Sequence, residues 1–255
     1  MEQGFDLKGR SIFIAIPAYD FKVTLKSAIS LAKFSQAAMR HGVDVQVGSI
    51  CGCSVVSRAR NLLIRDFLDS KCTDLMFIDA DINYEADSIF RLMSFGGDDA
   101  KKGVVAGIPR TRSTTVKFIG TPEVADDGTL IMNGRGLVKA KHVATAFMWI
   151  RREVVQKLVD GNPQWDYYDE RSERHLNATF DFELKPHMFD HGTDQAYYGE
   201  DYNFCDRVSE LGYEIWIDPS ITLGHLGVQE YMGNYGQDWL APRIQSLTEV
   251  DQDET

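Results

Sequence analysis

Strand and helix patterns alternate in the N-terminal part of the chain, and this alternation limits the folds that it can adopt. Residues 11–17 (SIFIAIP) and 74–78 (DLMFI) are nearly continuous apolar runs, which are typical of strands buried on both faces of a sheet. Residues 43–50 alternate in hydropathy as a strand does. Between these three strands, apolar residues recur at helical spacing in two segments, for which Thr24 and Ser57 are the expected N-caps. This order predicts an α/β fold with a mostly parallel central sheet flanked by helices.

The rest of the chain continues this pattern and then changes. Glycines, threonines and short alternating runs over 110–140 favour antiparallel hairpins, and the long polar and aromatic stretch 161–198 is expected to form a binding loop or lid. The other predicted elements are a helix over 85–93, a strand over 103–109, one continuous strand over 142–150, a helix over 152–159, and a helix and strand within 199–219.

Composition excludes two classes of protein. The net charge of −11 and the pI near 5.0 argue against a protein that binds the phosphate backbone of a nucleic acid. The N-terminus lacks a run of signal-peptide type, and no apolar run is long enough to span a membrane. We therefore expect no transmembrane segment and a soluble, cytoplasmic protein.

Two carboxylates, Asp79 and Asp81, directly follow the strand over 74–78. In an open parallel sheet, ligands bind beyond the carboxyl ends of the strands, where these side chains are expected to lie. They could cap the next helix, because acidic residues are favoured at helix N-termini. Alternatively, two carboxylates separated only by Ala80 could hold a divalent cation, which would complete its shell with water and substrate phosphates.

Two further segments could contact the anionic and aromatic parts of such a substrate. Arg58 and Arg60 lie in the first turn of a predicted helix, where the helix dipole disfavours cations, so either they bind an anion or they are solvated. Tyr19 and Asp20 follow Pro17 at the end of the first strand. There they could stack on a base and hydrogen-bond a ribose, although Tyr19 could equally be a rim residue.

Asp201 and His225 are two further candidates. Asp201, within GED at 199–201, opens a helix whose dipole favours an ionised carboxylate, as a general base requires, although it could be an ordinary first-turn residue. His225 stands near glycines after a strand, which suits a metal ligand but also an ordinary loop histidine.

Taken in order, these segments resemble the nucleotide-sugar glycosyltransferases of the GT-A fold, most of all the family 2 group and its small soluble viral and bacterial relatives. The resemblance spans roughly residues 11–227, and ARN followed by FIDAD is its most specific part. The segments that carry it are PAYD (17–20), SRARN (57–61), FIDAD (77–81), GED (199–201) and GHLG (224–227).

The resemblance implies a GT-A type, Rossmann-like sheet with a small antiparallel hairpin region, all within one catalytic domain over residues 1–247. The expected parts are a nucleotide-binding half (11–110), an acceptor and sugar half (111–227), a C-terminal segment (228–247) and a disordered acidic tail (248–255).

The resemblance also implies a metal-dependent transfer of a sugar from a nucleotide-diphosphate donor to a hydroxyl acceptor, a glycan or another molecule, with Mn²⁺ or Mg²⁺ as cofactor. Asp79 would face the ribose and, with Asp81 and His225, hold the metal; Asp201 would be the general base of an inverting reaction. The other implied site residues are Pro17, Tyr19, Asp20, Arg58, Arg60 and Ala80 for the nucleotide, Glu200 for donor or acceptor hydroxyls, and, from position alone, Thr145, Ala146 and Trp149 for the sugar or acceptor pocket.

Three alternatives remain open. A retaining enzyme of the same fold could carry the same motifs. A sugar-phosphate nucleotidyltransferase is less favoured, because PAYDFK lacks the glycines of the usual phosphate loop. A non-catalytic protein that binds a nucleotide-sugar or glycan ranks last, because metal ligands, base candidate and arginines occur together. The processive membrane-bound polysaccharide synthases are excluded, because no QXXRW motif follows the GED helix.

Overall fold

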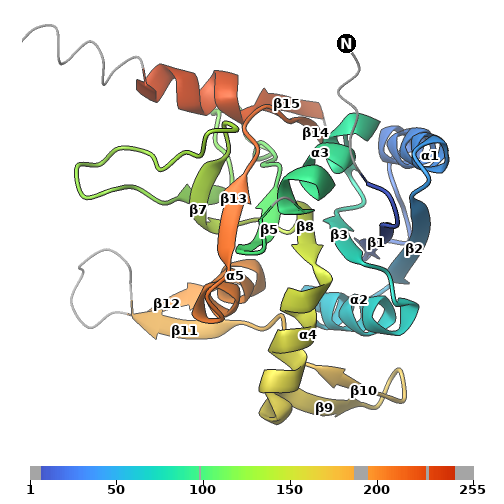
Figure 1. Ribbon diagram of the computed structural model, residues 1–255. Helices are drawn as coiled ribbons and strands as arrows, with labels where there is room; N and C mark the ends of the chain where they lie inside the picture. Colours follow the sequence, from blue (N-terminus) through green and yellow to red (C-terminus); the bar gives the residue numbers. More distant parts are fainter. Residues whose placement is uncertain (1–6, 98, 187–194, 228–229, 245–255) are drawn as a thin grey trace, which may run out of the picture.

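An eight-stranded sheet forms the centre of the computed structural model, which describes residues 7–97, 99–186, 195–227 and 230–244 (Figure 1). The strand order across the sheet is β2-β1-β3-β8-β5-β13-β7-β6. Its strands are β1 (Ser11–Ala18), β2 (Asp44–Cys51), β3 (Asp74–Ile78), β5 (Lys102–Ala106), β6 (Gly120–Pro122), β7 (Val138–Val143), β8 (Phe147–Arg151) and β13 (Glu214–Ile217).

Most of these strands run in one direction. β1 is parallel to both β2 and β3, and β5 is parallel to β13, whereas β8 and β7 run against their neighbours. The α/β class with a mostly parallel central sheet, flanking helices and a small antiparallel region, as expected for a GT-A type fold, is confirmed.

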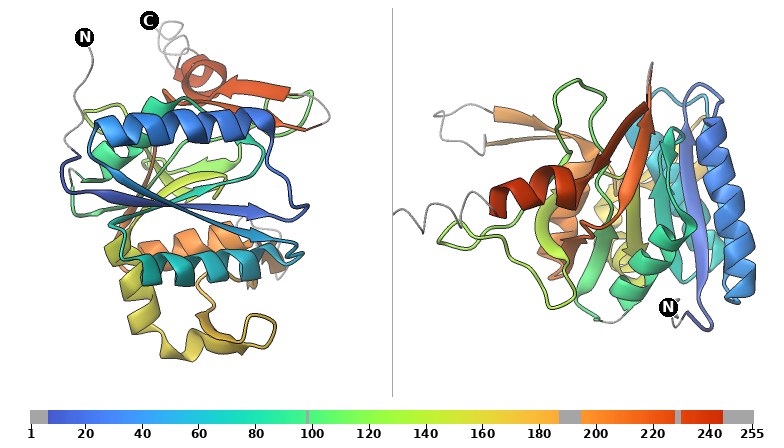
Figure 2. Two further views of the ribbon diagram at one scale, coloured as in Figure 1. Left: turned by 90° about the vertical axis from the view of Figure 1, so that its right-hand side faces the viewer. Right: turned by 90° about the horizontal axis from the view of Figure 1, so that it is seen from above.

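Helices cover both faces of the sheet (Figure 2). One face carries α1 (Leu25–Arg40) and α3 (Ala86–Gly97); the other carries α2 (Val56–Ser70), α4 (Arg152–Gly161) and α5 (Glu200–Glu210). Thr24 caps α1 as predicted, because its side chain accepts a hydrogen bond from the Ser27 backbone N–H at 3.2 Å. The prediction for Ser57 is wrong: α2 begins at Val56, two residues earlier than a Ser57 cap implies, its N-cap is Val55, and Ser57 is buried within the first turn.

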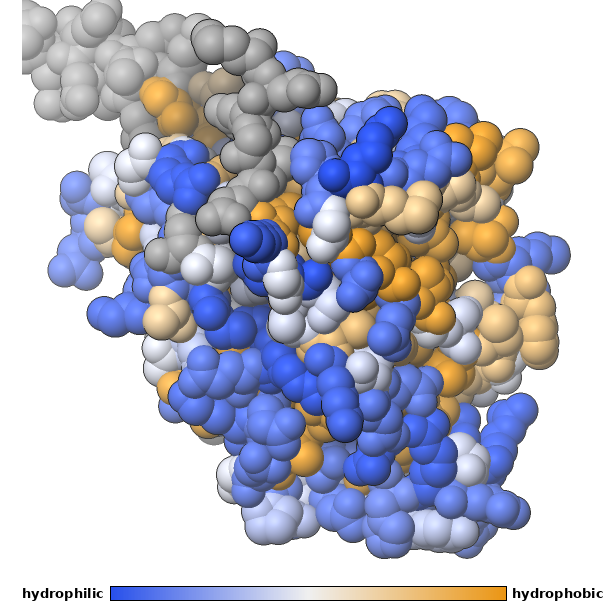
Figure 3. Space-filling view, turned by 45° about the vertical axis from the view of Figure 1, so that its right-hand side comes forward, coloured by the Kyte–Doolittle hydropathy of each residue, from blue (hydrophilic) through white to orange (hydrophobic). Residues whose placement is uncertain are grey.

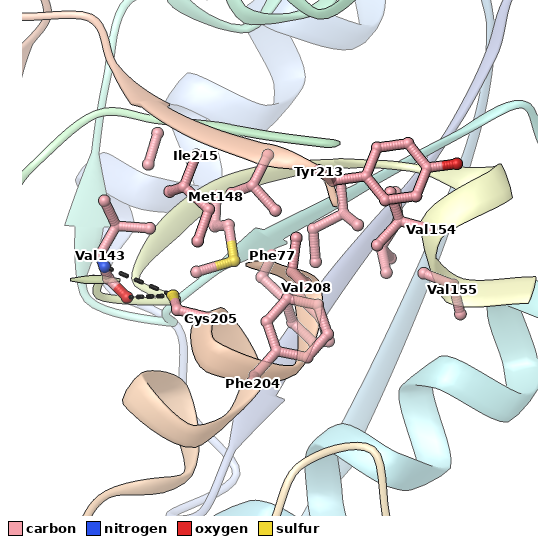
Figure 4. Close-up of a cluster of buried hydrophobic side chains, with 14 of the residues drawn as sticks. Phe77, Val143, Met148, Val154, Val155, Phe204, Cys205, Val208, Tyr213 and Ile215 are labelled. Atoms are coloured by element: carbon pink, nitrogen blue, oxygen red, sulfur yellow. Dashed lines mark hydrogen bonds between the residues drawn. The ribbon is translucent and has the colours of Figure 1, made fainter. Parts of the chain in front are cut away.

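Each face of the sheet has its own hydrophobic core. Under α2, α4 and α5, side chains of strands and helices interdigitate, and Phe77, Met148 and Phe204 are fully enclosed (Figure 4). Cys205 in this cluster contacts the Val143 carbonyl at 3.6 Å. These cores hold the strand ends that build the site in a rigid layer.

The predicted strand over 142–150 is wrong as one continuous element. The chain leaves β7 at Val143, crosses in 144–146, and enters β8 at Phe147, three positions away in the sheet order. The crossing consists of Ala144, Thr145 and Ala146, which are all buried, as the strands on either side are. The hydropathy pattern therefore could not reveal the break.

The described residues of 162–186 and 195–198 include two short antiparallel strand pairs, where the sequence predicted a binding loop or lid. β9 (Asp166–Asp169) pairs with β10 (Arg174–Asn177), and β11 (Glu183–Pro186) pairs with β12 (Gln195–Tyr198), after a short 3₁₀ turn at Pro163–Trp165. Residues 187–194 between β11 and β12, and the predicted disordered tail at 248–255, lie outside the described residues.

A small second sheet packs at the carboxyl-end edge of the main one. It consists of β4 (Ile82–Asn83), β14 (Thr222–Leu226) and β15 (Glu230–Asn234), in the order β15-β14-β4, and a short helical segment, Gly236–Leu240, follows it. Within the described part of the chain, no helix combines the length and the apolar character that a membrane crossing requires.

Candidate functional site

A cleft of about 560 Å³ opens where the carboxyl ends of β1 and β3 meet. Two sequence segments that were predicted to contact a nucleotide lie side by side in it. The predicted residues that line the cleft are Pro17, Tyr19, Asp20, Asp79, Ala80 and Asp81. The parallel pairing of β1 with β3 explains this meeting, because both strands end at the same edge of the sheet.

Backbone hydrogen bonds fix the turn that carries the two aspartates. The Thr24 N–H, at the start of α1, donates to the Ala80 carbonyl at 2.9 Å. The Asp79 N–H donates to the Ala146 carbonyl at 3.0 Å, and the Ile82 N–H donates to the Asp79 carbonyl at 3.1 Å. The turn is thus held from the α1 side and the β8 side, which fixes the backbone positions from which the two carboxylates extend.

The mouth of the cleft carries an exposed aromatic side chain. Tyr19 is 67% exposed, and Phe21, which has a left-handed backbone (φ 60°), is 75% exposed. The Asp20 carboxylate accepts a hydrogen bond from the Lys22 N–H at 3.3 Å, which closes the turn between β1 and α1. Exposed aromatic rings of this kind are available to stack on a flat ligand.

His225 lies beside Asp81, as the metal hypothesis requires. In the register of β4 and β14 it faces Ile82, and the Leu226 N–H donates to the Asp81 carbonyl at 3.0 Å. The His225 Nε2 is 3.6 Å from the Asp81 Oδ2. Two groups at this separation can ligate one cation.

The ring nitrogens of His225 are distinguished by their neighbours. Nδ1 is 2.8 Å from the Arg110 carbonyl, which can only accept, so Nδ1 carries the proton and donates. Burial lowers the pKa of His225, and with the proton on Nδ1 the neutral ring keeps a lone pair on Nε2, the nitrogen that lies near Asp81. This tautomer is the one that a metal ligand at Nε2 needs.

The donor set fits a divalent cation only in part. One carboxylate and one imidazole are ligand types that Mn²⁺ accepts, and a shell with few protein ligands is completed by water and phosphate oxygens. Over residues 7–97, 99–186, 195–227 and 230–244, no group of three or more His, Cys, Asp or Glu side chains is placed to hold an ion. Asp79 is not a third ligand in this arrangement, since its described ion pair is with Arg60.

Arg60 connects the cleft to α5. Its side chain is buried, with 5% of the residue exposed, and it forms an ion pair with Glu200. Its Nη2 is also 3.8 Å from the Asp79 Oδ1. Burial lowers the pKa of Arg60, but its guanidinium stays charged because its ordinary pKa is so high. A single buried cation therefore spans the two predicted halves of the site.

Asp201 does not line the large cleft; it faces a separate hollow of about 300 Å³. The other residues that line this hollow are Ile119, Tyr197, Tyr198, Gly199 and Tyr202. Tyr197 is 68% exposed. A carboxylate surrounded by tyrosines offers both a proton acceptor and flat apolar faces.

His142 supports the wall of this hollow and was not identified from the sequence. It is buried, its ring stacks on Tyr202 with centroids 4.5 Å apart, and its Nε2 is 2.7 Å from the Asp206 Oδ1. Asp206 also accepts from Lys185 at 2.6 Å. No sequence spacing indicates this group, because its members come from β7, β11 and α5.

The structure does not bring Arg58 to the cleft, which corrects the prediction of a basic pair near the nucleotide. Its Nε and Nη2 each donate to a carboxylate oxygen of Asp169 at 2.6 Å, and these hydrogen bonds hold the pKa of Asp169 far below its ordinary value. On α2, Arg58 and Arg60 point to different partners because positions two apart face different sides of a helix.

Of the three residues predicted for the sugar pocket, Trp149 is placed elsewhere. It is 1% exposed, packs in the core against α3, and donates from Nε1 to the Asp74 carboxylate at 2.7 Å. Thr145 and Ala146 lie next to the Asp79 turn but are buried. The Thr145 hydroxyl has no hydrogen-bond partner among the described residues, which is uncommon for a buried group.

A second hollow, of about 370 Å³ and mainly apolar, adjoins the cleft and shares Ala18, Lys22 and Val23 with it. Further exposed apolar side chains on α1 and β2 include Leu25, Ile29 and Val47. Figure 3 shows hydrophobic side chains gathered on this side of the molecule, within a mainly hydrophilic surface.

No family model matches the chain, and a search of curated proteins finds no match. Among solved structures, A197 from STIV aligns with a TM-score of 0.49 and 16% identity over 86% of each chain. TarS from S. aureus in complex with UDP-GlcNAc aligns with a TM-score of 0.45 and 12% identity, over 82% of this chain and 56% of that one. The mannosyltransferase PcManGT from Pyrobaculum calidifontis, in complex with GDP-Man and Mn²⁺, aligns with a TM-score of 0.44 and 11% identity, over 86% of this chain and 61% of that one. These TM-scores all lie below 0.5, so the similarity carries no argument about function. The function of the chain is therefore inferred from the residues of its own cleft.

Proposed function

We propose that the chain is a metal-dependent glycosyltransferase that moves a sugar from a nucleotide-diphosphate donor to a hydroxyl acceptor. One observation carries the proposal: buried Arg60 links Asp79, in the cleft, to Glu200, the neighbour of Asp201. A donor side and a carboxylate that can act as a base are thereby held in one rigid unit. Residues 1–247 would form a single GT-A-like catalytic domain.

The donor's nucleotide occupies the large cleft. Its volume of about 560 Å³ lies within the usual range for small-molecule sites. Tyr19 stacks on the base at the cleft mouth, while Asp20 and Asp79 accept hydrogen bonds from ribose hydroxyls. Pro17 and Ala80 form the walls, where small or rigid residues leave room for the nucleotide.

Asp81 and His225 are the residues that would hold a divalent cation, Mn²⁺ or Mg²⁺. When bound, the cation supplies Lewis-acid neutralisation of the leaving diphosphate. The neutral His225 ring offers its Nε2 lone pair without needing to lose a proton first.

Asp201 accepts the proton of the acceptor hydroxyl. As the proton leaves, the hydroxyl oxygen bonds to the anomeric carbon of the sugar, and the bond from that carbon to the diphosphate breaks. Attack from the side opposite the diphosphate inverts the configuration. The tyrosines around Asp201 favour a sugar as acceptor, because sugar rings present apolar C–H faces to aromatic rings. Glu200 keeps the Arg60 guanidinium in place and borders the acceptor hydroxyls.

A panel of nucleotide-sugars tests this function. We expect one base and sugar combination to raise the melting temperature in the presence of Mn²⁺, and the shift to disappear with Asp81→Asn. The same donor should release its nucleoside diphosphate when a glycan acceptor is added. If no member of the panel bound with Mn²⁺ or Mg²⁺, the donor assignment would be wrong; binding without turnover for any acceptor would favour the binding-protein alternative.

A further inference from the structure

A third side chain, Arg112, occupies the Asp81 and His225 corner. Its guanidinium forms an ion pair with the Asp81 carboxylate, and its Nε donates to the His225 Nε2 at 2.9 Å. Arg112 belongs to none of the motifs that suggested the site. Both atoms that would ligate a divalent cation thus direct their lone pairs at one guanidinium.

The chemistry of these contacts fixes which atom donates in each of them. A guanidinium has donors only, so the His225 Nε2 and the Asp81 Oδ2 both act as acceptors. The Arg110 carbonyl holds the opposite nitrogen of the ring at 2.8 Å, which fixes the orientation of the imidazole. Arg112 and a divalent cation therefore require the same lone pairs and cannot both have them.

Arg112 is free to move without unfolding its surroundings. Its side chain is 49% exposed and lines the large cleft. The turn that carries it is closed by a hydrogen bond from the Thr111 N–H to the Lys117 carbonyl at 2.8 Å, and Arg110 ties it to β15 through the Met232 carbonyl at 3.3 Å. Rotation about side-chain bonds is enough to turn the guanidinium from the corner into the cleft.

We propose that Arg112 is an internal cation that competes with the divalent cation for Asp81 and His225, and that it binds the donor's diphosphate after displacement. The inference rests on the proposed function. A guanidinium is well matched to phosphate oxygens, which it binds through paired N–H donors. Without a diphosphate the displaced guanidinium loses its partners; with one it gains new ones. Metal and diphosphate therefore bind cooperatively, and by linkage each strengthens the other equally.

Mn²⁺ binding, measured by the electron paramagnetic resonance signal of the free ion, tests the proposal without any sugar transfer. In the absence of nucleotide, Arg112→Gln is expected to raise Mn²⁺ affinity about 5- to 100-fold, the usual range of such coupling. Pyrophosphate, which probes the diphosphate whatever the base, should tighten Mn²⁺ binding in the wild type and much less in Arg112→Gln. Arg112→Lys, which keeps the charge but cannot span both acceptors, should fall between them.

Lys117→Gln is the matched control, because it removes the same charge from an exposed position of the same turn; its Mn²⁺ affinity should equal that of the wild type. Asp81→Asn should abolish Mn²⁺ binding in either background. If Asp81→Asn abolishes binding but Arg112→Gln leaves affinity unchanged or lower, Arg112 is not a competing cation, while the metal site stands. If neither the wild type nor Arg112→Gln binds Mn²⁺, the metal assignment and this inference both fail.

Discussion

Arg60 forms a buried ion pair with Glu200, and this pair joins the helix that follows β2 to the helix that carries the proposed base. The Asp79 carboxylate lies 3.8 Å from the same guanidinium. A buried charge is tolerated only where opposite charges surround it. The pair is therefore expected to be needed for both stability and geometry.

Removing one member of this pair should be costly. Arg60→Met leaves the Glu200 carboxylate buried without its partner, and we expect a loss of about 3 kcal/mol in the free energy of unfolding. The double variant Arg60→Met/Glu200→Gln should recover part of that loss. Urea denaturation of the set measures the coupling. The control is Arg65→Met, which breaks an exposed ion pair with Asp69 on the same helix and should lower the free energy of unfolding by less than about 0.5 kcal/mol. If the losses caused by the Arg60 and Glu200 substitutions were additive, the prediction would be contradicted.

Arg58 should matter for stability rather than for donor binding. Arg58→Ala removes both hydrogen bonds to the largely buried Asp169 carboxylate, for an expected loss of about 2 kcal/mol at pH 7 and no change in nucleotide affinity.

The pH dependence of this loss has a definite sign. The pKa of Asp169 is lower in the folded state than the value of about 3.9 in the unfolded state, so the contribution is full above that value and declines as the pH falls through it. The stability difference between wild type and Arg58→Ala should therefore shrink as the pH falls from about 5 to about 2, as chemical denaturation at each pH would reveal. A difference that grows on acidification would point to another partner for Arg58.

Asp201→Asn should abolish transfer while sparing the donor site. The amide cannot accept the acceptor's proton, so kcat is expected to fall about 100- to 10,000-fold. The thermal shift caused by donor and Mn²⁺ should persist, because Asp201 lies outside the donor cleft. Asp87→Asn, an exposed first-turn acid on α3, controls for the loss of one charge. Undiminished transfer by Asp201→Asn would rule out Asp201 as the base. For the wild type, NMR of the product's anomeric proton would show whether the configuration at that carbon is inverted or retained.

Gly96→Ala should reveal how tightly Trp149 is packed. Gly→Ala normally stabilises a helix, but a Cβ at Gly96 would overlap the ring of Trp149. We expect a loss of about 1 to 3 kcal/mol in the free energy of unfolding. Gly161→Ala, in α4 with open space around the new Cβ, should be neutral or stabilising. Equal effects at the two glycines would mean that the Trp149 environment is looser than described.

The alternation of strands and helices could be predicted from the sequence, and so could the position of Asp79 and Asp81 at a strand end. Local information was enough for this, because hydropathy periods and the Thr24 cap depend on neighbours along the chain. The parallel direction of the first three strands also followed from the order of the elements, whereas the pairing of β1 with β3 did not.

Which distant side chains meet could not be predicted from the sequence and follows from the tertiary structure. The insertion of β8 between β3 and β5, the pairing of Arg58 with Asp169, and the approach of Arg112 to Asp81 and His225 all depend on register and packing between segments far apart in sequence. Spacing along the chain does not indicate such contacts, because each arginine has many carboxylates in the sequence as possible partners. The packing of the folded chain selects one of them. Motif positions were thus readable from the sequence, whereas the partner of each charged group was not.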